Sequence, residues 1–286
     1  MKPAPFDYVA ARSVEHAVEL LAGDTEAKVI AGGQSLMPIL NMRLGRPELV
    51  IDIGRLDVLN HVRISESGAL LVGAAATQTQ LLAHPGINRA WPLLATAVSN
   101  IGHPQIRNRG TICGSLAHND PAAELPATAI ALDATMHIQS SRGLRTIPAE
   151  QMFVGPFMTA LAPDDLLIEA EFPLPPAGAG WSFREFATRP GDFATVGVAV
   201  QLIRRDGVVA DTRIVLFGVG GSATRVHSAE EVLMGSSPSR VENQVRAQLE
   251  AELDPADDVH ASAGLRQDLA EKLTIEAIAE AWERCA

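Results

Sequence analysis

The sequence predicts an α+β fold in two domains, and three observations support this. Segments that alternate as strands do and segments with helical periodicity follow one another without a regular strand–helix–strand rhythm. The run at residues 173–180 (PLPPAGAG) interrupts both patterns, because its prolines and glycines disfavour helices and strand pairing. The length of 286 residues is enough for two domains of ordinary size. We therefore expect a first domain at residues 1–176 and a second at residues 177–286.

The first domain is expected to mix short strands with helices. Ser13 can cap a helix whose apolar residues recur at helical spacing up to Gly23. Short apolar or alternating runs predict strands, and residues 66–68 (ESG) predict the turn of a hairpin. The expected strands lie at residues 28–31, 48–53, 61–65, 69–73 and 166–172 and on either side of residues 141–143. The expected helices follow Thr77 and cover residues 87–100 and 122–132.

The second domain is expected to hold a three-stranded sheet covered by helices. Alternating residues predict the strands, and Asp206 with Gly207 lies in a tight turn between the last two. The strands are expected at residues 181–187, 195–204 and 208–218, and the helices at residues 228–234, 240–253 and 262–284. The helical segments carry Val, Leu, Ile and Ala at helical spacing, so one face of each can cover the sheet.

The composition excludes several classes of protein. The net charge is −11 and no stretch concentrates Lys and Arg, which argues against a nucleic-acid partner. No apolar run approaches the ~18 residues of a membrane span. The N-terminus lacks the apolar core of a secretory signal, so we expect a cytoplasmic protein. Only Cys113 and Cys285 are present and the histidines show no metal-ligand spacing, so we expect no disulfide, metal site or iron–sulfur cluster held by this chain.

A glycine pair follows directly after an expected strand, in the segment AGGQSL at residues 31–36. Glycines let backbone N–H groups converge on an anion, and Ser35 adds a hydroxyl donor. The alternative is a tight strand-to-helix turn without a ligand, since isolated glycine motifs are weak signals. On its own, this segment leaves both interpretations open.

A second segment, IRNRGTICGSLAHNDPAAELP at residues 106–126, combines glycines, hydroxyl side chains, an Asn-Asp-Pro turn and an acidic residue. A loop without a function rarely needs so many special backbone positions and donors. Thr111 and Ser115 can hydrogen-bond phosphate oxygens, and the Glu124 carboxylate can accept from ribose hydroxyls, as acidic residues do in other dinucleotide sites. Neither segment is a P-loop or a Gly-x-Gly-x-x-Gly fingerprint. Together they form a candidate site for a phosphate-containing cofactor.

These two segments, with the tail PADDVHASAGLRQDLAEKLT at residues 255–274, resemble the FAD-binding medium subunits of carbon monoxide dehydrogenase-like molybdenum hydroxylases. Such subunits belong to the xanthine dehydrogenase and aldehyde oxidase family. The resemblance covers essentially the whole chain. It implies a two-lobed FAD-binding domain of the para-cresol methylhydroxylase type, followed by a C-terminal domain particular to these subunits.

The resemblance also implies which residues bind FAD. The two glycine segments would hold the pyrophosphate, and Glu124 would sit at the acidic ribose-binding position. Leu167 and Arg184 would approach the flavin ring, where Arg184 keeps the positive charge of the Lys found in many relatives. The full set of expected cofactor-binding residues is Ala31, Gly32, Gly33, Gln34, Ser35, Leu36, Thr111, Gly114, Ser115, Ala117, Asp120, Glu124, Leu167, Arg184 and Phe193.

Three residues in or near these segments also allow a structural interpretation. Cys113 has no second Cys nearby in sequence, so we expect a structural and not a redox-active thiol. We expect His118 to cap the turn at residues 119–121. Phe193 stands where many relatives place a tyrosine near the flavin, but a buried strand is expected directly after it. Both interpretations of Phe193, over the flavin or in the core, stay open.

No nucleophile–base pair or paired carboxylates emerge, so we expect no catalytic side chain, and the chemistry would belong to the cofactor. The resemblance implies non-covalent FAD that takes electrons from two-iron two-sulfur clusters on a small subunit, while a large subunit with a molybdenum cofactor hydroxylates the substrate. The electrons would pass on to a quinone, NAD or oxygen, and the complex would be a dimer of heterotrimers. Two alternatives stay open, a stand-alone FAD-dependent oxidase or reductase and a non-catalytic nucleotide-binding or scaffolding protein.

Overall fold

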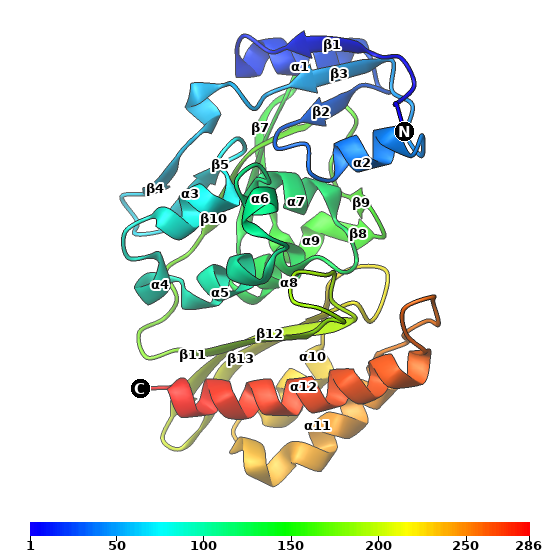
Figure 1. The fold of residues 1–286 in the computed structure, drawn as a ribbon. Coiled ribbons are helices and arrows are strands. Elements are labelled where there is room, and N and C mark those ends of the chain that lie inside the picture. The colour runs from blue at the N-terminus through cyan, green and yellow to red at the C-terminus, as the bar shows by residue number, and fades with distance from the viewer.

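The computed structural model describes residues 1–286 as three sheets with helices between and around them, and a small hairpin (Figure 1). The sheets follow one another along the molecule, from an N-terminal lobe through a second lobe to the C-terminal part. Separate sheets with mixed helices are the expected α+β class, which is confirmed.

The N-terminal lobe is a three-stranded parallel sheet in the order β1-β3-β2. Its elements are β1 (Asp7–Ala10), α1 (Val14–Gly23), β2 (Lys28–Ile30), α2 (Leu36–Asn41) and β3 (Leu49–Asp52). Ser13 caps α1 as expected, since its side chain accepts a hydrogen bond from the His16 N–H at 3.1 Å. The sequence does not predict β1, because its residues are mostly exposed. The β2–α2 connection at residues 31–36 follows the carboxyl end of this small sheet, where parallel strands commonly present ligand sites.

The second lobe is built on a five-stranded antiparallel sheet in the order β4-β5-β10-β6-β7. Its strands are β4 (Val62–Ile64), β5 (Leu70–Gly73), β6 (Thr135–Ser140), β7 (Gly143–Pro148) and β10 (Leu166–Phe172). Its other elements are a 3-10 helix (Asp57–Leu59), α3 (Gln78–Ala83), α4 (Ile87–Ala90), α5 (Pro92–Asn100), α6 (Pro104–Arg107), α7 (Ile112–His118), α8 (Glu124–Ala131), α9 (Ala149–Met152), β8 (Phe153–Gly155) and β9 (Met158–Thr159). The hairpins expected around residues 66–68 and 141–143 are confirmed. The sequence does not predict α6, α7 or the β8–β9 hairpin.

The C-terminal sheet has four antiparallel strands in the order β11-β12-β13-β14, not the three expected. The strands are β11 (Gly180–Phe186), β12 (Val196–Arg205), β13 (Val208–Phe217) and β14 (Thr224–Arg225), and the helices are α10 (His227–Leu233), α11 (Pro238–Glu252) and α12 (Ala263–Arg284). β14 was missed because it is only two residues long. Asp206 and Gly207 form the expected tight turn, with φ of 52° and 76°. None of the helices has the combination of length and apolarity needed to cross a membrane.

The C-terminal sheet packs on both of its faces. One face meets α8, whose residues are all buried, and Phe183, Ala199 and Phe217 of this sheet belong to the same hydrophobic cluster as the core of the second lobe. The other face forms a separate hydrophobic cluster with α10, α11 and α12. The proposed domains therefore share one core across their contact, and the boundary at residue 176 stays a prediction.

Candidate cofactor-binding site

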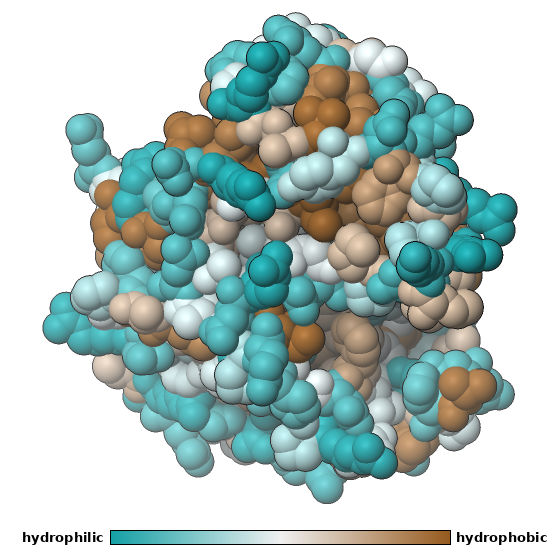
Figure 2. Space-filling view, turned by 45° about the horizontal axis from the view of Figure 1, so that its top comes forward, coloured by the Kyte–Doolittle hydropathy of each residue, from teal (hydrophilic) through white to brown (hydrophobic).

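A cavity of about 750 Å³ opens where the two lobes meet the C-terminal part of the chain. Its wall combines the β2–α2 connection, residues of α7, the start of α8, strand β10 and the loop between β11 and β12. Cofactor and small-molecule sites commonly have volumes of ~300–1,000 Å³. On the face drawn in Figure 2, hydrophobic residues lie in recesses between hydrophilic ones. The cavity is lined by every expected cofactor-binding residue except Arg184.

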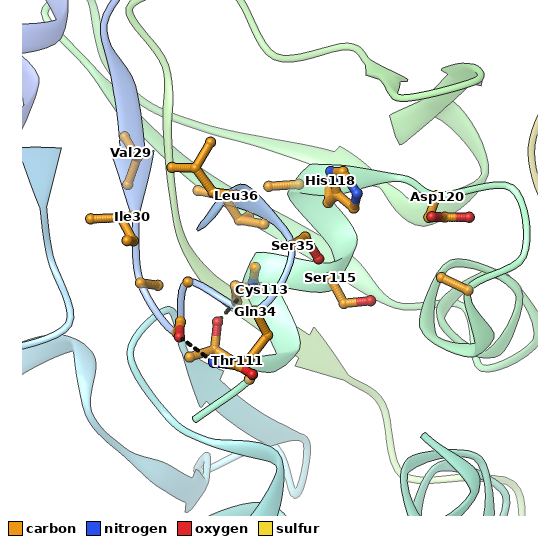
Figure 3. Close-up of a pocket in the computed structure, with 18 of the residues that line it drawn as sticks. Val29, Ile30, Gln34, Ser35, Leu36, Thr111, Cys113, Ser115, His118 and Asp120 are labelled. Atoms are coloured by element: carbon orange, nitrogen blue, oxygen red, sulfur yellow. Dashed lines mark hydrogen bonds between the residues drawn. The ribbon is translucent and has the colours of Figure 1, made fainter. Parts of the chain in front are cut away.

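The first glycine segment lines this cavity and contains free backbone donors. The N–H groups of residues 33–36 donate to no acceptor within the protein. Gly33 has φ of +72°, in the left-handed region, and the Gln34 side chain donates to the Gly32 carbonyl at 3.2 Å (Figure 3). A Cβ atom on Gly32 would lie 2.0 Å from the Arg109 carbonyl oxygen, so the two glycine segments touch here. Successive unpaired N–H groups in a glycine-rich turn are suited to bind an anion such as a pyrophosphate.

The second glycine segment forms the start of α7. Thr111 caps this helix, since its Oγ1 accepts a hydrogen bond from the Gly114 N–H at 3.0 Å (Figure 3). A Cβ atom on Gly114 would lie 2.7 Å from that Oγ1, so the cap requires glycine. The Thr111 hydroxyl can still donate its proton, and the hydroxyls of Ser35 and Ser115 have no partner within the protein. Three hydroxyl donors therefore supplement the backbone donors of the first segment.

Glu124 is one of the acidic residues that line the cavity. It is the first residue of α8 and is only 5% exposed. The pKa of Glu124 is raised to about 8, mainly by burial and to a lesser extent by the nearby charges of Glu185 and Asp120, against the lowering effect of a backbone hydrogen bond. Burial also raises the pKa of Glu185 to about 7, and its Oε2 atom is buried without a hydrogen-bond partner. A buried carboxyl in this position is suited to accept hydrogen bonds from ligand hydroxyls, which would favour its charged form.

The loop between β11 and β12 brings the C-terminal part of the chain to the cavity. Phe193 lines the cavity and is 68% exposed, so the interpretation of this residue as part of the core is wrong. Gly191 has φ of +86°, and a Cβ atom there would lie 2.7 Å from Cε1 of His103. The loop is therefore seated closely on the second lobe. Leu167 of β10 lines the same cavity and is buried, as expected for a residue beside a flat ring.

Arg184 was expected in the site, but the structure places it elsewhere. Its guanidinium donates to Glu276 at 2.7 Å and to Glu280 at 3.1 Å, and both acids lie on α12. Successive residues of β11 point to opposite faces of the sheet, so Phe183 enters the shared core while Arg184 points toward α12. Arg184 therefore does not line the cavity.

The structure fits the expected role of Cys113 but not that of His118. Cys113 is buried in α7 with its Sγ 3.5 Å from the Val72 carbonyl, and burial raises the pKa of its thiol, so a structural role fits as expected. His118 does not cap the following turn. Asn119 holds that turn by donating to the Gly155 and Met158 carbonyls, both at 2.8 Å. His118 instead lines the cavity, packs against Phe157 with ring centroids 5.1 Å apart, and has a pKa lowered by burial.

Several cavity residues were not identified from the sequence. Val29 and Ile30 of β2 and the Phe157 and Met158 side chains of the β8–β9 hairpin also line the wall. These are apolar residues in ordinary patterns, and only the packing of distant segments brings them together. The apolar wall, the free donors and the buried acid fit a dinucleotide cofactor such as FAD, which carries a flat ring, a ribose and a pyrophosphate.

Comparison with known proteins agrees with this geometry. Residues 4–175 match the FAD binding domain in molybdopterin dehydrogenase, and residues 181–281 match the CO dehydrogenase flavoprotein C-terminal domain. The chain is 42% identical to the 6-hydroxypseudooxynicotine dehydrogenase complex subunit alpha of Paenarthrobacter nicotinovorans, over 99% of this chain and 97% of that protein. It is 35% identical to the carbon monoxide dehydrogenase medium chain of Hydrogenophaga pseudoflava, over 100% of both chains. A solved structure of carbon monoxide dehydrogenase from that organism contains a similar chain, with a TM-score of 0.96, 36% identity and 100% coverage of both chains. The chain therefore belongs to the family of FAD-binding medium subunits of carbon monoxide dehydrogenase-like molybdenum hydroxylases.

Proposed function

We propose that this chain carries FAD in a molybdenum hydroxylase complex and passes electrons from two-iron two-sulfur clusters of a small subunit to an external acceptor. The observation that carries the proposal is the extent of the similarity. Subunits of such complexes match this chain along nearly its whole length and nearly their own, and both parts of the chain match the corresponding family models. A stand-alone flavin oxidase would not require this C-terminal part. FAD supplies the redox chemistry when it is bound.

The residues of this chain would bind and orient that cofactor. The free N–H groups of residues 33–36 and the Ser115 hydroxyl would receive the pyrophosphate. Glu124 would accept hydrogen bonds from ribose hydroxyls, and Leu167 and Phe193 would flank the ring and exclude water from it. The lowered pKa of His118 keeps its imidazole neutral at pH 7, so it adds no charge to the apolar part of the wall.

The substrate of the complex is proposed to be chosen by the large subunit. One relative is named for a 6-hydroxypseudooxynicotine dehydrogenase and another for carbon monoxide dehydrogenase, yet both match this chain along its whole length. A subunit that is shared by complexes named for such different compounds has no need of a pocket for either of them.

The proposal is tested by purifying the tagged chain from its native host and measuring flavin, molybdenum and iron in the eluate. We expect a large and a small partner chain, all three cofactors, and by native mass spectrometry a dimer of heterotrimers. Reoxidation with a quinone, NAD and oxygen in turn then identifies the acceptor, and fractionation of host cells checks the expected cytoplasmic location. A chain that elutes alone, with neither molybdenum nor iron, would contradict the subunit proposal.

Bound FAD is expected to be non-covalent. Cys113 lines the cavity, but the raised pKa of its thiol keeps it protonated and unreactive. Precipitation of the yellow protein with acid should therefore leave all flavin in the supernatant, as measured by absorbance. Flavin that stays with the pellet would show a covalent bond, and peptide mapping would then test Cys113 and His118.

The exchange Phe193→Tyr is expected to change the flavin and not the fold. Because Phe193 is 68% exposed, the added hydroxyl meets water and the free energy of unfolding should change by less than about 0.5 kcal/mol. The flavin absorption bands or the rate of reoxidation should shift, since the hydroxyl adds a polar group at the cavity. Phe186→Tyr, at an exposed phenylalanine that does not line the cavity, is the control. If both variants leave the flavin unchanged, Phe193 does not lie near the ring.

A further inference from the structure

The tail at residues 255–274 contains a buried arginine that the cavity itself does not use. Arg266 lies in the first turn of α12 and is 8% exposed. Its Nη1 donates to the Thr195 carbonyl at 2.5 Å and to the Gly218 carbonyl at 2.7 Å. Its Nη2 donates to the Asp258 carboxylate at 2.7 Å. A buried guanidinium with two carbonyl acceptors and one carboxylate partner is held in one position, because the loss of any of these hydrogen bonds would leave a buried donor unsatisfied.

The two carbonyls that Arg266 binds belong to segments that continue into the cavity wall. Thr195 ends the loop that carries Phe193, and its N–H closes that loop by donating to the Phe186 carbonyl at 2.7 Å. Gly218 follows β13, and its N–H donates to the Pro121 carbonyl at 2.9 Å. Pro121 directly follows Asp120, which lines the cavity. One guanidinium thus joins the Phe193 loop to the segment between α7 and α8.

Gly218 shows how closely these segments meet. Its φ is +75°, and a Cβ atom there would lie 2.4 Å from the Thr195 carbonyl oxygen. Both carbonyl oxygens accept a hydrogen bond from the same nitrogen of Arg266, so both dipoles are directed toward one positive group. Without a positive group between them these carbonyls would repel, and the two segments would separate.

Asp258 holds the guanidinium from the other side. Its Oδ1 accepts the N–H groups of His260 at 2.8 Å and Ala261 at 2.9 Å, which folds the loop before α12 around the carboxylate. The hydrogen bond from Arg266 lowers the pKa of Asp258 to about 2, so the carboxylate is charged at every pH at which the protein works. The loop thus delivers a fixed negative charge to Arg266.

We propose that Arg266 is a positioning residue for the FAD cavity, which holds the Phe193 loop and the Asp120–Pro121 segment in register by binding the Thr195 and Gly218 carbonyls. This inference rests on the proposed function, because it assumes that the cavity receives FAD. The hydrogen-bond partners of the Arg266 side chain do not line the cavity, so Arg266 would act through the backbone of segments that continue into the cavity wall.

The test compares FAD binding by the full chain in three variants, with titration of the flavin-free protein followed by fluorescence. Arg266→Ala should raise the Kd for FAD at least tenfold, which is about 1.4 kcal/mol, and should make bound flavin more accessible to iodide. Arg266→Lys should weaken binding by an intermediate factor, since a single ammonium cannot reproduce the fork that reaches two carbonyls and a carboxylate. Arg204→Ala is the control, because Arg204, although exposed, also donates to a backbone carbonyl, that of Cys285, at the other end of β12.

The control variant should lower the unfolding temperature while it leaves the Kd for FAD within about twofold of the wild type. If the Kd of Arg266→Ala also stays within that range, the positioning role is overturned and Arg266 is a structural residue like Arg204. If Arg266→Ala does not fold, Arg266→Lys decides in the same way, and a wild-type Kd in that variant overturns the inference. A wild-type chain that binds no FAD refutes the proposed function instead, so the two failures are distinguishable.

Discussion

Replacing Gly33 with valine is expected to give a folded, colourless protein whose affinity for FAD is lowered at least a hundredfold, about 2.7 kcal/mol. Gly33 has φ of +72°, which a β-branched residue avoids, and its Cβ atom would lie 3.1 Å from Cδ1 of Ile30. The connection must therefore change its backbone conformation. Because its four N–H groups are free in the present conformation, a changed backbone should disrupt the proposed site for the pyrophosphate.

The control for Gly33→Val is Gly68→Val in the turn between β4 and β5. Gly68 also has a positive φ, +87°, but nothing lies within 4 Å of its Cβ position and it does not line the cavity. Both variants should lose stability through backbone strain, of about 1–3 kcal/mol. Only Gly33→Val should lose flavin, and the flavin content is measured as the ratio of flavin absorbance to protein absorbance. A Gly33→Val protein with full flavin content would remove the first glycine segment from the site.

The cavity residues that could be predicted from the sequence lie mostly in two continuous segments. In residues 31–36 and 111–124, glycines, hydroxyl residues and an acid stand close together, and such local chemistry can be recognised without knowledge of the fold. The resemblance to a known family added Leu167 and Phe193, which line the cavity from distant parts of the chain. Their contribution as FAD ligands stays a prediction.

Arg184 could not be placed from the sequence. Neighbouring residues of a strand point to opposite faces, and the acids that bind Arg184 lie 92 and 96 residues further along the chain. The same limit applies to the shared core. The sequence shows that β12 is apolar over most of its length, but it does not show that α8 covers one face of the sheet. β14 and the β8–β9 hairpin were missed because two or three residues carry too little periodic signal.

The second large effect concerns Glu124, a buried acid of the cavity. Burial raises the pKa of Glu124 from 4.5 to about 8, so the folded protein without FAD favours the protonated carboxyl. The stability from this protonation is fully present below the unfolded pKa of 4.5 and is lost as the pH rises through about 8. The loss is of the order of a few kcal/mol, at about 1.4 kcal/mol for each unit of pKa shift. The free energy of unfolding of the protein without FAD should therefore be lower at pH 8.5 than at pH 6.5, because Glu124 loses its proton.

Glu124→Gln is expected to move stability and FAD affinity in opposite directions. The neutral amide avoids the burial of a charge, so at pH 8.5 the FAD-free variant should be more stable than the wild type by about 1–3 kcal/mol in urea unfolding, and the pH dependence should be weaker. FAD should bind about tenfold more weakly at that pH, because ribose hydroxyls form stronger hydrogen bonds to a carboxylate than to an amide. The wild-type affinity should also rise with pH as FAD binding draws the proton from Glu124. Glu185→Gln is the control: its carboxyl is also buried, with a pKa raised to about 7, but it does not line the cavity. Because the charge of Glu185 raises the pKa of Glu124, its removal favours the Glu124 carboxylate, so this variant should gain stability without weaker FAD binding. If Glu124→Gln binds FAD as tightly as Glu185→Gln does at pH 8.5, the carboxylate of Glu124 is not a ligand of the ribose.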